Sequence, residues 1–262
     1  RWASSSSGRR APREATTALN KLAVRMIEAG APVNAQTVFL HDGIKDPGDT
    51  PLIWACSAGI YQDSAAADRL PVVQALLSHG ADPDLPGTGG ITPFMWAAVL
   101  NNSDPEQEKI ALALLDAGNP DLKRRLNAHA RGTGFSSLST AILKRLIEAG
   151  CDVNERFFVS KQSPLHLLCT REEPPERVIP LIELLIKAGA DPNQLDVDGL
   201  TPLMACNSPE IALCLMNNGA NPSLRNEDGQ TAYDFHMKNG YREIAEAIKK
   251  WQSAQKKTAR DQ

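Results

Sequence analysis

Apolar residues recur at spacings of three and four in several segments of this chain, and polar, glycine-containing phrases separate the segments. Residues 14–34 show the pattern first, with apolar positions at Leu19, Leu22, Ala23, Met26 and Ile27. This spacing predicts an amphipathic helix. Gly30 follows it, at a position where a helix can end in a left-handed conformation.

One phrase occurs twice in the second half of the chain. Residues 184–193 read LLIKAGADPN, and thirty residues later 214–223 read CLMNNGANPS. Between them lies the phrase DGLTPL at 198–203. Self-similarity with a period of roughly 20–50 residues predicts a repeat architecture.

The opening D-G-x-T-P-L and the closing L-L-x-x-G-A-D-x-N resemble the ankyrin repeat. Asp198-Gly199 suits a tight turn that needs positive φ. Thr201 can cap the next helix, with Pro202 in its first position, and Gly219 can end the second helix. The resemblance implies an all-α fold, an ankyrin-repeat solenoid of helix-turn-helix units with β-hairpin fingers.

The repeat pattern predicts a disordered basic leader at 1–13, one ankyrin-repeat domain at 14–251 and a basic tail at 252–262. The lone Trp2 in the leader is not expected to nucleate a core. The expected units of the domain are about 14–35, 49–84, 90–121, 134–154, 161–193, 198–223 and 228–251. The first and last of them fit terminal caps, which repeat arrays need for solubility.

Several units depart from the regular pattern. Residues 60–71 form a polar insertion between two helices, and 170–180 are expected to be a proline-stiffened loop, because proline disfavours a helix interior. The third repeat lacks a clear first half. Either Leu122–Ala130 supplies an irregular helix there, or residues are missing from the sequence near 126–141. Both alternatives stay open.

Charge and composition exclude some classes of partner. The net charge is −3, but residues 1–13 and 249–262 are basic, which leaves an acidic body. An acidic body disfavours nucleic acid, because phosphate neutralisation needs a basic face. We also expect no membrane span, because the chain has no apolar run of about 18 residues, and no signal peptide is visible.

The five cysteines form no C-x-x-C pair, so we expect reduced thiols and a cytoplasmic protein, or one delivered into a host cytosol. No phosphate-binding loop, dinucleotide fingerprint or H-E-x-x-H occurs. His166 and Cys169 have a spacing that suits a metal pair. However, His166 holds the fourth place of T-P-L-H, where the resemblance implies a hydrogen bond to finger backbone. We therefore expect no enzyme, no cofactor and no bound metal.

The resemblance implies that a partner protein binds at the finger tips and on the exposed face of the first helices. The candidate residues are Val38, Phe39, Leu40, His41, Lys123, Arg124, Arg125, Arg156, Phe157, Phe158, Val159, Leu195, Val197 and Arg225. Contiguous exposed apolar side chains often mark an interaction site. Alternatively, Phe39 and Phe157 fold back to pad their fingers, and 123–125 are a solvated hairpin edge. Trp54 and Trp96 are expected to face neighbouring repeats in the core.

These patterns predict a non-catalytic protein–protein interaction module that is monomeric by itself. A second hypothesis is a scaffold segment of a larger multidomain protein. A bacterial effector or toxin-neutralising protein would fit the irregular repeats, and a metal-dependent enzyme built on them is the least favoured hypothesis. Fold alone does not name the partner.

Overall fold

The computed structural model describes residues 13–41, 44–61, 69–99, 105–117, 139–156 and 160–258. The chain forms two compact units, one of Arg1–Arg125 with Ser137–Arg145 and one of Leu126–Ser136 with Leu146–Gln262. Each unit is built from pairs of short helices joined by turns. The expectation of a single domain over 14–251 stays a prediction.

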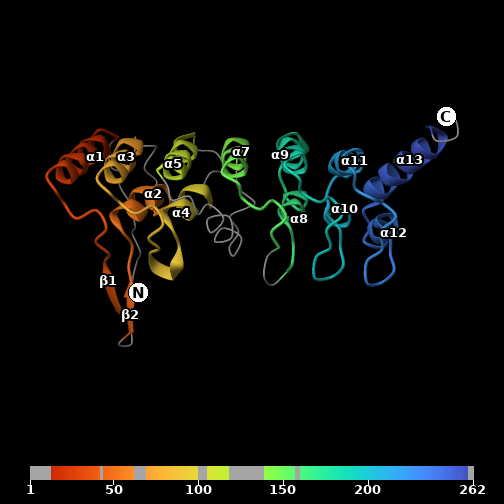
Figure 1. Cartoon of the computed structure of the whole chain (residues 1–262), viewed down its shortest axis with the longest axis horizontal. Coiled ribbons are helices and arrows are strands. Elements are labelled where there is room, and N and C mark those ends of the chain that lie inside the picture. The colour runs from red at the N-terminus through yellow and green to blue at the C-terminus, as the bar shows by residue number, and fades with distance from the viewer. Residues whose placement is uncertain are drawn as a thin grey trace, which may run out of the picture. The chain divides into compact units, whose positions relative to one another are not determined.

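In the first unit the second helices of the repeats form one row and the first helices form another (Figure 1). The first row holds α1 (Arg13–Glu28), α3 (Leu70–Ser78) and α5 (Pro105–Asp116). The other row holds α2 (Pro51–Tyr61) and α4 (Pro93–Val99). A short 3-10 turn covers Thr88–Gly90, and α7 (Thr140–Glu148) begins in this unit. Helix α3 packs against both α1 and α5, and α2 against α4.

One finger of the first unit is a β-hairpin. Strand β1 (Val38–His41) pairs antiparallel with β2 (Ile44–Pro47), and Phe39 lies opposite Asp46. The other described fingers contain tight turns, in which Asp196 N–H donates to the Leu200 carbonyl and Asn226 N–H to that of Gln230. With so few residues between the two ends of the turn, no ladder has room to form. These turns do not conflict with the expected β-hairpin fingers, which stay a prediction for the fingers other than 38–47.

The second unit repeats the same two-row arrangement (Figure 1). Its first helices are α8 (Pro164–Cys169), α10 (Pro202–Ala205) and α12 (Ala232–Lys238). Its second helices are α9 (Pro175–Lys187), α11 (Pro209–Asn217) and α13 (Arg242–Thr258). Helix α11 packs against α9 and α13, and α10 packs against α8 and α12.

The helix boundaries follow from the residues expected to set them. The Thr201 hydroxyl accepts the Met204 N–H at 3.3 Å, with Pro202 in the first helical position. Gly219, after α11, has φ of +97°, which is the left-handed region that glycine tolerates. The predicted capping role of Thr201 and the predicted helix end at Gly219 are confirmed.

Two helix boundaries differ from expectation. Helix α9 begins at Pro175 and contains Pro180, where a loop was expected through 180. Pro180 is exposed and removes one backbone hydrogen bond near the helix start, while Val178, Ile182 and Leu185 are buried and hold the helix in place. Helix α13 continues to Thr258, so the residues expected to start the basic tail are helical through that point.

The core prediction was wrong for Trp54. Its side chain is 50% exposed, whereas Trp96 on α4 is half-buried. Helix α4 has α2 as a neighbour, but in the described part of the chain no first helix precedes α2. Among the described residues, no helix has both the length and the apolar character to cross a membrane.

Candidate partner-binding surface

Asparagine side chains join consecutive turns within each unit. The Asn154 amide donates to the Gly189 carbonyl at 2.8 Å and accepts the Asp191 N–H at 2.7 Å. The same pair of hydrogen bonds links Asn193 to Gly219 and Asn221 at 3.0 and 2.7 Å, and Asn34 to Gly80 and Asp82 at 2.9 and 2.8 Å. The sequence analysis assigned no role to these asparagines. Their recurrence four residues after a closing glycine was the available signal.

Arg156 connects two fingers of the second unit. Its Nε donates to the Lys161 carbonyl at 3.2 Å, and its terminal nitrogen donates to the carbonyl of Leu195 in the next finger. The Val197 N–H donates to the Ser160 carbonyl at 2.9 Å, and the Gln194 amide donates to the Asn154 carbonyl at 3.1 Å. These bonds tie residues 154–156 and 160–161 to the finger at 194–200. We call these joined segments the finger platform.

Leu195 and Val197 stand out from the platform with side chains that are 42% and 47% exposed. Asp196 between them is buried, and its Oδ1 accepts the N–H groups of Asp198 and Leu200 at 2.9 Å each. The buried Asp196 carboxylate fixes the turn through these two hydrogen bonds. Because Asp196 faces inward, Leu195 before it and Val197 after it face outward. Two adjacent exposed apolar groups on a hydrogen-bonded backbone form a preorganised contact surface.

His166 on α8 is hydrogen-bonded to the backbone of the finger platform. Its Nε2 lies 3.0 Å from the Leu200 carbonyl oxygen, and its Nδ1 accepts the Ser163 N–H at 3.1 Å. Burial lowers the pKa of His166, against the opposite effect of the Leu200 carbonyl. The hydrogen bond to finger backbone implied by the T-P-L-H motif is confirmed.

The structure brings part of the expected site together. Arg156, Leu195 and Val197 meet on the finger platform, and Arg225 lies in the next finger, where its guanidinium donates to the Gly229 carbonyl. Val38, Phe39, Leu40 and His41 form strand β1. Lys123, Arg124, Arg125, Phe157, Phe158 and Val159 lie outside the described residues.

The described residues contain no group of three or more His, Cys, Asp or Glu side chains placed to hold a metal ion. All five cysteines are free and buried. Burial raises the pKa of Cys56 and of Cys206 to about 12 each. A thiol with so high a pKa is a poor nucleophile at neutral pH, because the thiolate is the reactive form.

Two models of one family match the chain. Residues 175–261 match ankyrin repeats in three copies, and residues 47–88 match a single ankyrin repeat. Both matched stretches hold the helix pairs and glycine-ended turns described above. The chain is an ankyrin-repeat protein.

Several human proteins resemble parts of the chain. Ankyrin repeat and SOCS box protein 6 is 30% identical over 154 residues, which cover 48% of this chain and 35% of that protein. Protein phosphatase 1 regulatory subunit 27 is 39% identical over 71 residues, covering 26% of this chain and 46% of that protein. Ankyrin repeat domain-containing protein 37 is 34% identical over 109 residues, covering 40% and 66%. The chain thus matches about a third of the length of the first of these relatives.

Two solved structures share the fold. The ankyrin repeat domain of Bcl-3, a member of the IkappaB protein family, is 21% identical with a TM-score of 0.58, covering 90% of this chain and 96% of that one. The ankyrin repeat domain of human ASB11 is 20% identical with a TM-score of 0.59, covering 91% and 96%. Together with the family, these similarities support a protein-interaction module.

Proposed function

We propose that this protein binds a partner protein through the finger platform. The observation that carries the proposal is the pair of exposed apolar side chains, Leu195 and Val197, on a backbone that Arg156 holds in place. A surface already fixed by hydrogen bonds loses little conformational entropy on binding, so its apolar area converts into affinity more fully. The partner would present a complementary apolar patch.

The class of protein supports a binding role rather than a catalytic one. Among the relatives, Protein phosphatase 1 regulatory subunit 27 is named as a subunit of another protein's assembly. We place the binding in the cytoplasm, because all five cysteines are free and buried, as is typical of a reducing compartment. In this proposal the partner contacts the finger platform and the exposed face of the first helices α8, α10 and α12.

The test compares three forms of the full chain as baits in a lysate, read by quantitative mass spectrometry. Leu195→Asp/Val197→Asp places two charges on the platform. The matched control, Met237→Asp/Tyr241→Asp, changes two exposed side chains of the same unit, on and just after α12. Circular dichroism first shows that all three are folded.

A partner held at this site is expected to fall about tenfold or more in capture by the platform variant, since two buried charges at a contact cost at least about 1.4 kcal/mol. The control variant should retain it. Loss from the control alone would move the site to the last repeat. Equal capture by all three would contradict the proposed platform.

A further inference from the structure

Helix α1 carries a stripe of exposed apolar side chains. Leu19, Leu22 and Met26 are 61%, 53% and 56% exposed. They follow one another at intervals of three and four residues, so they lie along one side of the helix. Apolar residues with this spacing are typical of a helix that packs against a second helix. The stripe therefore indicates a surface suited to one more helix.

The other second helices show what covers this side within a repeat. Met26 stands four residues before the closing Gly30, and in the equivalent places Leu76, Leu185 and Leu215 are at most 2% exposed. Helices α3, α9 and α11, which hold these leucines, pack against the first helices of their own repeats, α2, α8 and α10. In the described part of the chain no first helix precedes α1. The element that would cover the stripe is therefore a helix in the first-helix position.

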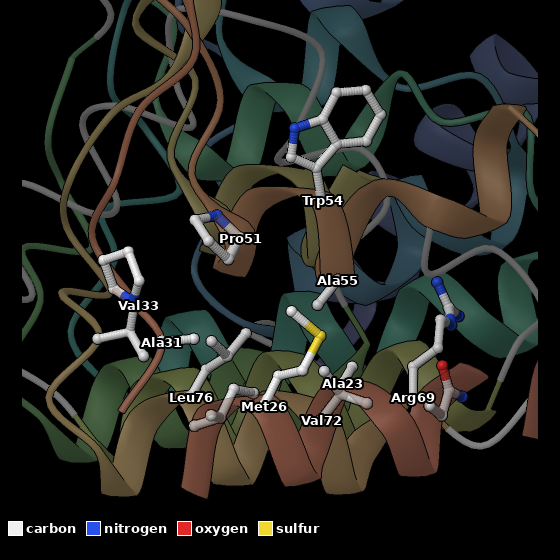
Figure 2. A pocket seen from close by; sticks show the side chains of 13 residues that line it. Ala23, Met26, Ala31, Val33, Pro51, Trp54, Ala55, Arg69, Val72 and Leu76 are labelled. Carbon is white, nitrogen blue, oxygen red and sulfur yellow. The ribbon is translucent and has the colours of Figure 1, made fainter. Parts of the chain in front are cut away.

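The stripe borders a groove large enough to receive side chains. A cavity of about 410 Å³ lies between α1, α2 and α3, and Met26, Trp54 and Leu76 are among the residues that line it. Figure 2 shows Met26 reaching from α1 toward Ala55 on α2. Trp54 is 50% exposed, so apolar surface is open on the α2 side as well as on α1.

The charged residues beside the stripe are basic. Lys21 and Arg25 are exposed on α1 and border the stripe on one side, because a helix has about 3.6 residues per turn. Glu28 lies further along, at the end of α1. Helices α2 and α3, which form the other walls, contain no charged residue, and Arg69 at one end of the groove is paired with Glu106 at 3.6 Å. The basic border favours a partner that places carboxylates there.

We propose that the groove between α1, α2 and α3 binds an amphipathic helix of a partner protein. This helix would lay its apolar side against Leu22 and Met26 and place Asp or Glu side chains beside Lys21 and Arg25. Such binding is the helix-in-groove mode of recognition. A second copy of this chain fits less well, because it would bring its own Lys21 and Arg25 to the contact, and like charges repel. The groove lies in the first unit, so the proposal does not depend on the finger platform.

Fluorescence anisotropy of two labelled helical peptides with the full chain tests the proposal. Both peptides have about five helical turns, roughly 18 residues, with leucines at spacings of three and four. One carries glutamate beside the leucines and the other carries lysine. The glutamate peptide is expected to bind about fivefold or more tightly at low salt, since like charges replace ion pairs in the lysine peptide. The double variant Lys21→Glu/Arg25→Glu should reverse this preference.

Two further variants locate the contact. Leu22→Gln/Met26→Gln removes the apolar side chains but keeps the charge and the helix propensity of α1, and should weaken binding of the glutamate peptide about tenfold or more. Lys249→Glu/Lys250→Glu is the matched control, because it makes the same change of net charge on exposed residues of α13. This control should bind both peptides as the wild type does. Circular dichroism first shows that every variant is folded.

Three results would overturn the proposal. The first is equal binding of the two peptides by the wild type, and the second is no binding of either below about 1 mM. The third is a dimer of the chain, measured by light scattering, that Leu22→Gln/Met26→Gln dissociates. That result would assign the groove to a second copy.

Discussion

His166 on α8 and Leu200 in the following finger are joined by a hydrogen bond of 3.0 Å from Nε2 to the main-chain carbonyl. The other ring nitrogen, Nδ1, accepts the N–H of Ser163. The imidazole thus needs one protonated and one unprotonated nitrogen, which is the neutral form. Asp196 and Arg156 exert opposite electrostatic effects on this ring. The neutral His166 side chain thus hydrogen-bonds both to the finger platform, at Leu200, and to the start of α8, at Ser163.

Stability of the second unit should fall in mild acid. Burial lowers the pKa of both His166 and His236 in the folded state. The unfolded chain, with histidine pKa about 6.5, binds these protons first as the pH drops. Stability is therefore full above about pH 6.5 and is lost progressively below it. Urea unfolding at several pH values between about 7.5 and 5 measures the effect.

The variants His166→Gln and His79→Gln separate this effect from general acid denaturation. His166→Gln should be less stable at neutral pH and should lose less stability on acidification than the wild type. His79 is exposed, so its variant should keep the full loss. An identical pH dependence in the wild type and in His166→Gln would contradict the assignment.

Asn154→Ala should destabilise the second unit by about 1–3 kcal/mol, because it removes two hydrogen bonds between consecutive turns. Asn218 is the control, since its amide bonds the Cys214 carbonyl within its own helix end. Asn218→Ala should cost less, roughly 0.5–1 kcal/mol. Equilibrium urea unfolding measures both losses. Equal losses would contradict a special contribution of the hydrogen bonds that Asn154 makes to the following turn.

Gly199→Ala should cost more than Gly229→Ala. Both glycines have positive φ, +70° and +74°. A Cβ at 199 would meet the Glu227 backbone nitrogen at 3.1 Å, whereas a Cβ at 229 meets nothing within 4 Å. Both variants carry the strain of a positive φ. The difference between their losses of stability, about 1 kcal/mol, therefore measures the cost of the close contact between the finger of Gly199 and that of Glu227. Thermal unfolding of both variants gives this difference, and a larger loss for Gly229→Ala would refute the argument.

The five cysteines should resist thiol reagents in the folded protein. All are buried, and burial raises the pKa of Cys151 to about 11 and of Cys56 to about 12. Few thiolates form at pH 8, and access is blocked. A colorimetric thiol assay should therefore find almost no reaction in buffer and all five thiols in concentrated urea. Rapid reaction of any thiol in the native state would show that its helix opens easily.

Sequence was enough to predict the repeat, because its signals are local. Thr201 caps a helix within three residues, and Gly219 ends one through its own backbone. Each depends only on nearby atoms, so the residue type is sufficient. The histidine of T-P-L-H was also predictable, because its position in the repeat implies which backbone lies beside it.

Other features depended on tertiary contacts. Pro180 lies in a helix because Val178 and Leu185 are buried on the inward face, and their burial outweighs one lost hydrogen bond. Trp54 and Trp96 both stand third after the proline that begins their helices, yet Trp54 is more exposed, because in the described part of the chain no first helix precedes α2. Arg156 hydrogen-bonds to the Leu195 carbonyl, 39 residues along the chain. The hydrophobic periodicity of the sequence does not predict a contact over that distance.

The sequence by itself thus determined the repeat, the helix start that Thr201 caps and the helix end at Gly219, since short-range hydrogen bonds and backbone preferences specify them. Only the tertiary structure decided which apolar faces are covered, which asparagines join the turns and which finger side chains stand together. These depend on which element packs beside which, and that is a property of the stacked repeats rather than of any one of them.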